Sequence, residues 1–241
     1  MILPYLRTIS GHIKSMKVNY RSSAKKVINL EIEALRKLKN SLNNNFDKAV
    51  NTIINCQSKI ILCGVGKSGL IASKIASTLS SIGCPAFSLS ANDCLHGDLG
   101  SISRNDVLIL ISNSGNSEEL APIIKFANRN KIKIIGIVSK KNSTLYRGSD
   151  IKILLPEVRE AGLDIVPTSS TSMQLAIGDA LAVVCLNKRK FSKYDFSKLH
   201  PGGNLGKQLK TVEDLMATKS KVPFIDENKN LKDALKTITS K

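Results

Sequence analysis

The sequence contains no tryptophan, and aromatic residues make up only 4% of its 241 residues. Proteins that bind single-stranded nucleic acids stack bases on such rings, so little is available here for that purpose. Acidic residues are also scarce, with 19 Asp and Glu against 36 Lys and Arg, which gives a net charge of +17. The basic residues are spread along the whole chain and do not gather in one segment. We therefore expect neither a nucleic acid nor a membrane surface as a partner.

Cysteine pairs at the spacing of zinc or redox sites are absent as well. The five cysteines are odd in number and no two are separated by two residues, which excludes a C-x-x-C site and argues against a disulfide framework. We expect most of them to be small core residues. No apolar run approaches the ~20 residues of a membrane span, and the apolar start Met1–Tyr5 is too short for a secretory signal. The expected location is the cytoplasm.

The chain does contain a regular alternation of short aliphatic runs and helical patterns. Val107–Ile111 is an unbroken apolar run, typical of a strand buried on both faces. The alternation predicts an α/β fold with a doubly wound, five-stranded parallel sheet flanked by helices. An amphipathic helix is expected over residues 22–44. The expected strands lie near residues 59–63, 85–90, 106–111, 132–138 and 151–155.

Hydroxyl side chains follow the third expected strand. Ser112, Ser114 and Ser117 lie between the end of that strand and a helical pattern that resumes at Glu119. Their hydroxyls, together with the free backbone N–H groups of a helix N-terminus, can hold one anion without an arginine. The pattern predicts a phosphate site, and a serine-rich turn with an N-cap remains the plainer alternative.

A second turn between a strand and a helix is rich in glycine. Gly64–Gly69 matches the G-x-G-x-x-G pattern, but the next strand, residues 86–90, ends without the carboxylate that would hold the ribose of NAD. A Walker A loop would need glycine five residues before Gly66, where Ile61 stands. A small phosphorylated ligand remains, with Lys67 as a cation beside it. The alternative is a turn that only lets a strand meet a helix.

A third hydroxyl cluster precedes the long apolar helix that starts near Met173. Five consecutive hydroxyl residues, Thr168–Ser172, follow Pro167. Capping would explain one or two of them, so we expect a further anion site at this helix N-terminus.

These motifs together resemble the sugar isomerase (SIS) domains of the arabinose-5-phosphate isomerase family. The resemblance covers about residues 25–210 and rests on Gly64–Gly69, His96–Gly100, Ser112–Ser117, Pro167–Thr171, Gly178–Ala182 and His200–Gly203, which occur in the family's order. It implies a flavodoxin-like SIS fold and the interconversion of ribulose 5-phosphate and arabinose 5-phosphate, which supplies the lipopolysaccharide sugar Kdo. It also implies a homotetramer whose active sites are completed by neighbouring subunits. No metal or cofactor is expected.

The resemblance assigns a role to each matching residue. Moving a proton between C1 and C2 through an enediol needs a base, a cation or donor for the oxyanion, and a group that opens the sugar ring. Glu119 is the expected base, because it is expected one helical turn into a helix that begins at the serine cluster. Lys67 is the expected cation, Glu160 a second active-site carboxylate and His200 the ring-opening group. Glu118 points about 100° away from Glu119 on a helix and is expected to be solvated. The expected substrate-binding residues are Gly66, Ser68, His96, Ser112, Asn113, Ser114, Ser117, Thr168, Ser169 and Ser170.

The expected organisation is a basic lead (1–21), an SIS domain (22–210) and a remnant of a first CBS domain (211–241). Ser90 stands where relatives commonly have His, and Asp93 replaces a longer acid. Two further functions stay open: an isomerase of another sugar phosphate, such as sedoheptulose 7-phosphate, and a non-catalytic sugar-phosphate sensor. The complete set of candidate bases argues against the sensor, and the His200–Gly203 motif favours arabinose 5-phosphate.

Overall fold

The computed structural model describes residues 19–200, 212, 216, 218 and 222–239. Most of the expected basic lead, the Pro201–Gly203 part of the last motif, and part of the expected CBS remnant lie outside these residues. The chain divides into two compact units, Met1–Ser80 with Cys84–Arg189, and Ser81–Gly83 with Lys190–Lys241. The expected SIS domain, residues 22–210, thus contributes to both units, and its bounds stay a prediction.

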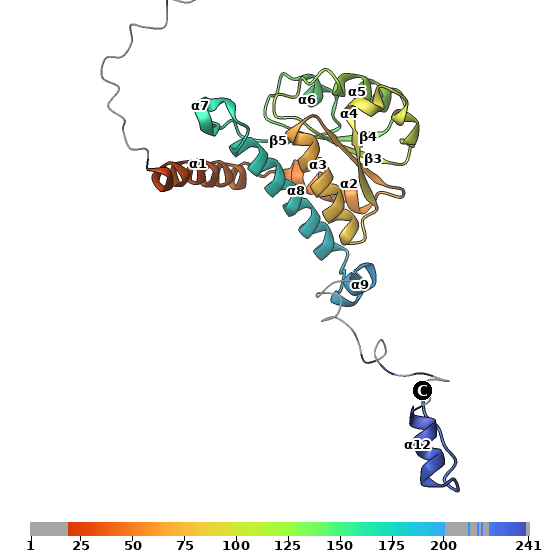
Figure 1. Cartoon of the computed structure of the whole chain (residues 1–241). Coiled ribbons are helices and arrows are strands. Elements are labelled where there is room, and N and C mark those ends of the chain that lie inside the picture. The colour runs from red at the N-terminus through yellow and green to blue at the C-terminus, as the bar shows by residue number, and fades with distance from the viewer. Residues whose placement is uncertain (1–18, 201–211, 213–215, 217, 219–221, 240–241) are drawn as a thin grey trace, which may run out of the picture. The chain divides into compact units, whose positions relative to one another are not determined.

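The larger unit is built on one parallel sheet of five strands in the order β2-β1-β3-β4-β5 (Figure 1). The strands are β1 (Ile60–Gly64), β2 (Ala86–Ser90), β3 (Val107–Ile111), β4 (Lys133–Val138) and β5 (Ile151–Leu154). Every residue of β1 and β3 is buried, as the aliphatic runs predict for strands covered on both faces. The predicted fold class is confirmed.

Helices cover both faces of the sheet. One side carries α1 (Tyr20–Ser41), α2 (Asn44–Ile54), α3 (Lys67–Ser81) and α8 (Ser169–Lys188), and the other α4 (Ala91–Cys94), α5 (Leu120–Arg129) and α6 (Thr144–Gly148) (Figure 1). The 3-10 helix η1 (Asp98–Ser101) and α7 (Ala161–Ile165) complete this unit. Strand connections in such sheets are right-handed, so the connection from β1 to β2 and those from β2 to β5 run over opposite faces.

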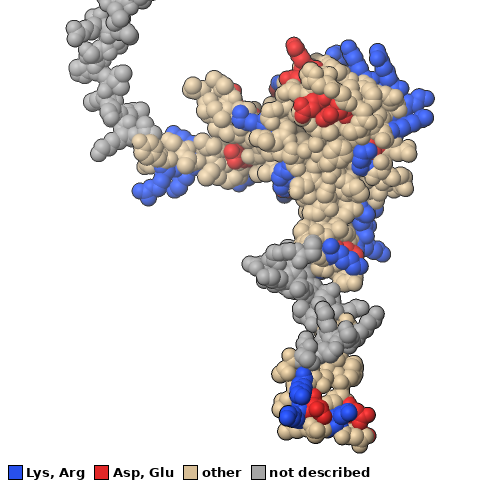
Figure 2. Space-filling view, turned by 45° about the vertical axis from the view of Figure 1, so that its right-hand side comes forward, with Lys and Arg blue, Asp and Glu red and all other residues tan. Residues whose placement is uncertain are grey.

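The smaller unit contains α9 (Lys193–Leu199) and α12 (Leu231–Thr239) among its described residues. In the described chain, α8 alone has the length and hydropathy to cross a membrane, and half of that stretch is buried. A core helix of a soluble protein has the same properties, and α8 packs against α1 and α2. On the face seen in Figure 2, basic side chains lie on several separate elements with acidic side chains between them.

Four of the cysteines lie in the packed interior, as expected for small core residues. Cys63, Cys84, Cys94 and Cys185 are buried, and Cys56 is half-buried. Burial raises the pKa of Cys63 and of Cys185 to about 12. These two thiols are therefore neutral at physiological pH and act as apolar groups.

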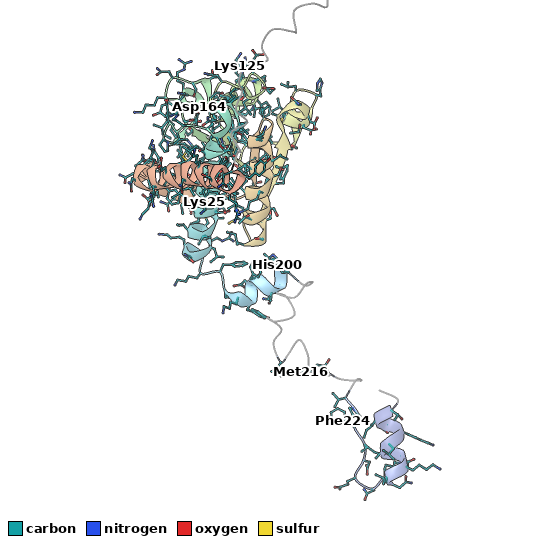
Figure 3. All side chains as sticks on the ribbon, turned by 60° about the vertical axis from the view of Figure 1, so that its left-hand side comes forward. Lys25, Lys125, Asp164, His200, Met216 and Phe224 are labelled. Atoms are coloured by element: carbon teal, nitrogen blue, oxygen red, sulfur yellow. The ribbon has the colours of Figure 1, made fainter. Side chains whose placement is uncertain are left out.

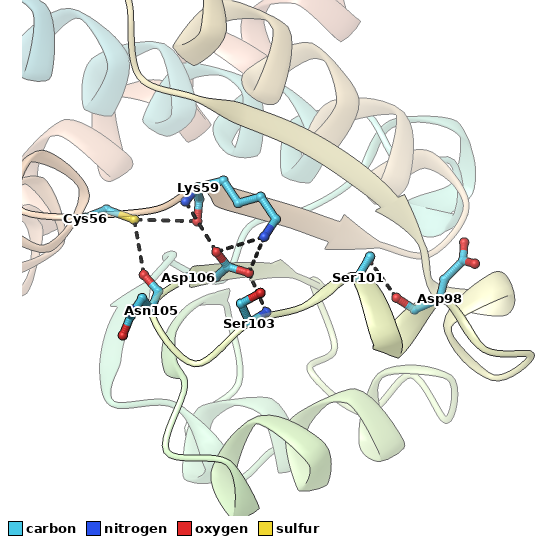
Figure 4. A network of polar contacts seen from close by, with 7 residues as sticks. All are labelled: Cys56, Lys59, Asp98, Ser101, Ser103, Asn105 and Asp106. Atoms are coloured by element: carbon cyan, nitrogen blue, oxygen red, sulfur yellow. Dashed lines mark hydrogen bonds and ion pairs between the residues drawn. The ribbon is translucent and has the colours of Figure 1, made fainter.

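A buried carboxylate joins the starts of β1 and β3 (Figure 4). The side chain of Asp106 is fully buried and accepts hydrogen bonds from Lys59 Nζ at 2.9 and 3.1 Å. It also accepts from the backbone N–H of Lys59 at 3.3 Å and of Ser103 at 2.6 Å. Burial alone raises the pKa of Asp106, but the hydrogen bonds from Lys59, Ser103 and Ser58 outweigh it and bring the pKa below its usual range.

We predict that Asp106→Asn lowers the free energy of unfolding by about 2–3 kcal/mol at pH 7, because one carboxylate oxygen becomes an N–H donor that faces other donors. Since the folded-state pKa of Asp106 is lowered, its contribution is complete above the unfolded-state pKa near ~4 and is lost as the pH falls through the folded-state pKa. Urea unfolding at pH 7 and in acid should show the difference between the two proteins shrinking in acid.

Glu157→Gln is the matched control for this prediction, because Glu157 is paired with Lys140 on the surface with 65% of its side chain exposed. It should change the free energy of unfolding by less than about 1 kcal/mol. Equal effects of the two substitutions at pH 7 would contradict the role given to Asp106.

Candidate functional site

The predicted phosphate loop and the glycine-rich turn lie next to each other at the carboxyl edge of the sheet. The glycine-rich turn follows β1 and the serine loop follows β3, and these two strands are hydrogen-bonded neighbours. The chain reverses its direction of winding at β1, with β2 on one side and β3 on the other. Ligands of doubly wound sheets bind in the crevice at such a reversal.

The serine loop folds around its own hydroxyl groups. The hydroxyls of Ser112 and Ser117 lie 3.0 Å apart, and the backbone N–H of Gly115 donates to Ser112 Oγ at 3.0 Å. Ser112 is buried, whereas Ser114 is exposed and accepts a hydrogen bond from the N–H of Asn116 at 3.3 Å. The O–H of Ser114 is therefore left to donate to a ligand.

The same loop is fixed against the connection between β4 and α6. Gly115 has φ of +68°, and a Cβ atom there would clash with Ser143 Oγ, so only glycine fits this approach. The carbonyl of Gly115 accepts from the N–H of Leu145 at 2.9 Å, and Asn116 Oδ1 accepts from the N–H of Thr144 at 2.9 Å. A loop held in this way is organised before a ligand arrives, which lowers the entropy lost on binding.

Asn113, another expected substrate-binding residue, is held in this scaffold by its backbone and by its side chain, whose Oδ1 also contacts Ser139 Oγ. Its carbonyl accepts from the N–H of Ser139 at 3.2 Å and from Ser139 Oγ at 2.7 Å.

Glu119 follows the loop directly, but its place in the helix differs from the prediction. It was expected one turn inside the helix, whereas it is the N-cap of α5, and the N–H of Leu120 bonds to the carbonyl of Ser117 at 3.2 Å. The side chain of Glu119 makes no capping hydrogen bond. Glu118 is exposed, as expected, and Glu119 is half-buried. The Glu119 carboxylate is therefore not consumed by the helix end that it precedes.

The glycine-rich turn brings β1 and α3 into close contact. A Cβ atom on Gly64 would lie 2.8 Å from the backbone of Ser68, so this part of the motif serves the strand-to-helix approach. Gly66 and Lys67 are exposed, and Lys67 is the first residue of α3. Ser68 turns the other way and donates from Oγ to Gln174 Oε1 of α8 at 3.1 Å.

A cavity of about 550 Å³ opens beside this turn, between it and the segment that follows β2. Its walls include the carboxylates of Asp93 and Asp98 and the hydroxyls of Ser73, Ser88 and Ser90. Such groups accept and donate hydrogen bonds to the hydroxyls of a polyol. The motifs did not identify Ser73, Ser88 or Asp98, although Asp98 stands inside the His96–Gly100 motif. His96 itself is exposed and is not among the lining residues.

Glu160 occupies the helix end that was expected to bind an anion. Its carboxylate accepts from the N–H of Thr168 at 2.8 Å, from Thr168 Oγ1 at 3.2 Å, and from the N–H of Ser170 at 3.3 Å. Burial raises the pKa of Glu160, but hydrogen bonds from Ser170 and Thr168 outweigh it and lower the pKa. Glu160 was predicted as a second active-site carboxylate, and Thr168, Ser169 and Ser170 as substrate-binding residues. The Glu160 carboxylate occupies the place where these three residues were expected to bind substrate. An anion could enter only if Glu160 moved away.

His200 belongs to the smaller unit. It directly follows the last residue of α9 (Figure 3). Its ring stacks on Phe196 with a centroid distance of 3.8 Å, and Nδ1 lies 2.9 Å from the carbonyl oxygen of Phe196. Lys67, Glu119 and Glu160 belong to the larger unit. The assignment of His200 to the same site stays a prediction.

Comparisons with known proteins identify the family. The family model described as the SIS domain matches residues 53–184. The chain belongs to the SIS domain family. It is 41% identical over 225 residues to the arabinose 5-phosphate isomerase KdsD of Francisella tularensis, which covers 91% of this chain and 69% of that protein. It is 39% identical over 226 residues to KdsD of Yersinia pestis, with 93% and 69% covered.

A solved structure of a related protein agrees with this result. The protein c3406 of Escherichia coli CFT073, in complex with arabinose 5-phosphate, superposes with a TM-score of 0.73 at 32% identity, covering 75% of this chain and 97% of the other. The predicted resemblance to arabinose-5-phosphate isomerases is confirmed by these relatives.

We predict that changing Ser114 and Ser117 together to Ala raises the KM for a sugar phosphate strongly. Each hydroxyl should contribute roughly 1.5–3 kcal/mol as a hydrogen bond to a charged group. The hydrogen bonds that hold the loop against Thr144 and Leu145 involve neither residue. Ser41→Ala, in which the lost hydroxyl bonds only to the carbonyl of Leu38 at the end of α1, is the control. Unchanged substrate binding by the double variant would reject the serine loop as the phosphate site.

Proposed function

We propose that this protein interconverts D-ribulose 5-phosphate and D-arabinose 5-phosphate through an enediol. The observation that carries the proposal is the uncommitted carboxylate of Glu119, two residues after the last hydroxyl of the serine loop. An enzyme of this kind needs a base held at a fixed place relative to the phosphate grip. The KdsD relatives support the same assignment.

The serine loop is the better of the two phosphate sites. Its hydroxyls and backbone N–H groups are not hydrogen-bonded to a carboxylate in the described residues. The N-terminus of α8, in contrast, is occupied by the Glu160 carboxylate. A phosphate at α8 would lie against a negative charge, which is unfavourable at close range. We therefore assign the phosphate to the loop and the N-terminus of α8 to Glu160.

The rest of the sugar lies toward the cavity beside β1 and β2. Neighbouring strands are about 4.8 Å apart, so the ends of β3 and β2 are separated by roughly 10 Å, comparable to the length of an extended pentose phosphate. The acidic and hydroxyl walls of the cavity then receive the sugar hydroxyls. Lys67, exposed at the start of α3 between the two places, is next to the reacting carbons.

The reaction starts on the open-chain sugar. From ribulose 5-phosphate, Glu119 removes a proton from C1, the C1–H electrons form the C1–C2 double bond, and the ammonium group of Lys67 stabilises the negative oxygen on C2. Return of a proton to C2, with a proton moving between the two oxygens, gives the aldose. The resemblance assigns the opening of the arabinose 5-phosphate ring and the transfer of this proton to His200. Glu160, ionised and hydrogen-bonded, is the weaker candidate for the base.

The proposal includes the biological setting implied by the family. The product serves Kdo and lipopolysaccharide synthesis in the cytoplasm, and the resemblance assigns residues 211–241 to a CBS region. An isomerase of another sugar phosphate remains the second candidate, because the β2 segment carries Ser90 and Asp93 in this chain. Conversion of purified ribulose 5-phosphate to arabinose 5-phosphate tests the proposal directly, and sedoheptulose 7-phosphate is the comparison substrate.

A homotetramer is part of the proposal and is supported by exposed apolar side chains. On the loop of α7, Leu163 is 92% exposed and Ile165 73%, and on α1 Ile28 is 55% exposed. Large apolar groups on a soluble protein commonly mark contact surfaces. We predict that sedimentation at micromolar concentration gives a tetramer, and that Leu163→Asp with Ile28→Asp shifts it to smaller species. A monomer with full activity would remove this claim.

We predict that Glu119→Gln lowers kcat by ~10²–10⁴ with little change in KM, because the amide keeps the size of the side chain but cannot accept a carbon-bound proton. Glu118→Gln is the control, because the Glu118 carboxylate is next to Glu119 in the sequence and is exposed. Exchange of hydrogen between solvent and C1 or C2 should fall with kcat in Glu119→Gln and stay normal in the control. Undiminished exchange would move the base to Glu160.

A further inference from the structure

A buried amide lies behind the glycine-rich turn. Gln174 is 0% exposed and interrupts the apolar face of α8, among neighbours such as Met173 and Ile177. Its Oε1 accepts the hydrogen bond from Ser68 Oγ at 3.1 Å, and its Nε2 has no partner. A buried amide that satisfies only one end is less favourable than an apolar side chain of the same size. Its presence therefore needs a reason other than packing.

The helix that carries Gln174 also holds the second carboxylate. Ser170, one turn earlier on α8, donates its N–H to Glu160 at 3.3 Å, and residues four apart lie on the same side of a helix. On the other side of the contact, Ser68 follows Lys67 directly. Helix α8 thus holds Glu160 through its first turn. Through its second turn it holds the glycine-rich turn that carries Lys67.

The contact between α3 and α8 continues beyond this pair. Lys74 forms an ion pair with Asp179, and Ile75 packs against Gly178. These contacts follow one another along both helices, and they fix the orientation of α3 relative to α8. Gln174 hydrogen-bonds only to the first turn of α3. The amide is placed to fix the turn and not the whole helix.

We propose that Gln174 is a positioning residue, whose buried amide holds Ser68 so that the turn presents Lys67 to the reacting carbons. This inference rests on the proposed function, because Lys67 has its role there. Gln174 does not touch the substrate and acts through Ser68. The unpaired Nε2 lowers the stability of the fold, and we interpret this loss as the cost of positioning the turn.

The test compares Gln174→Met, Ser68→Ala and the double variant with the wild-type chain. Met has nearly the same shape without the amide, and Met173→Leu, next to it in the same core, is the control. We expect kcat to fall roughly 10- to 100-fold in Gln174→Met. KM should change little, because the serine loop is untouched. The thermal midpoint of Gln174→Met should equal or exceed that of wild type, since a partly unpaired amide has been removed. The double variant should be no worse than the poorer single variant, as expected for residues that act through one contact.

Hydrogen exchange of the backbone amides gives a readout that does not require activity. Exchange over residues 64–70 should be faster in Gln174→Met, while residues 112–117 keep the wild-type rate. Unchanged exchange over residues 64–70 overturns the inference, whether or not the wild-type chain isomerises pentose phosphates. A fall in thermal midpoint with faster exchange over both segments also overturns it, because it indicates a general packing role. An inactive wild-type chain with the expected exchange pattern would reject the proposed function and leave the tether between Gln174 and Ser68 in place.

Discussion

Complete burial of β1 and β3 on both faces is the constraint on which the site depends. Strands with no solvent-facing side can carry polar side chains only at their ends, because a buried polar group without a partner is unfavourable. At the amino ends the polar groups are neutralised among themselves, as Asp106 and Lys59 show. At the carboxyl ends, in the turns that begin at Gly64 and Ser112, we propose that they bind a ligand. The winding reversal at β1 places these two turns side by side.

Much of this arrangement was accessible from the sequence, because aliphatic runs bounded by turns have few other structures. The strand expected near residues 106–111 is β3, which begins one residue later at Val107. The start of α5 was predicted less well, since helical spacing includes the turn before a helix as readily as the helix, and Glu119 is therefore the N-cap. Contacts between distant segments were out of reach. No periodicity indicates that Gln174 meets Ser68 across 106 positions, or that Glu160 fills the end of α8.

The two helix ends at the site show how one local pattern can have opposite electrostatic outcomes. Hydroxyl residues at a helix N-terminus present donors and a positive dipole end, and either an external or an internal anion can satisfy them. At α8 the internal anion is Glu160, only eight residues before Thr168. At the serine loop the nearby acids Glu118 and Glu119 lie beyond the hydroxyls, and neither caps the loop. The difference that decides between a substrate site and a structural cap is therefore the position of the nearest carboxylate.

The segment between Glu160 and Thr168 connects the site with the proposed assembly. Gly162, Leu163 and Asp164 have φ of 60°, 64° and 63°, and for the two residues with side chains such a conformation costs about 1–3 kcal/mol each. Part of this is offset because Asp164 Oδ1 accepts the N–H of Glu160 at 2.5 Å. The exposed Leu163 side chain buries little apolar surface within its own subunit, so it does not offset this strain. A neighbouring subunit that buried Leu163 would offset the strain, and through Asp164 it would also hold the backbone of Glu160. Association and the placement of the Glu160 carboxylate would then be one equilibrium.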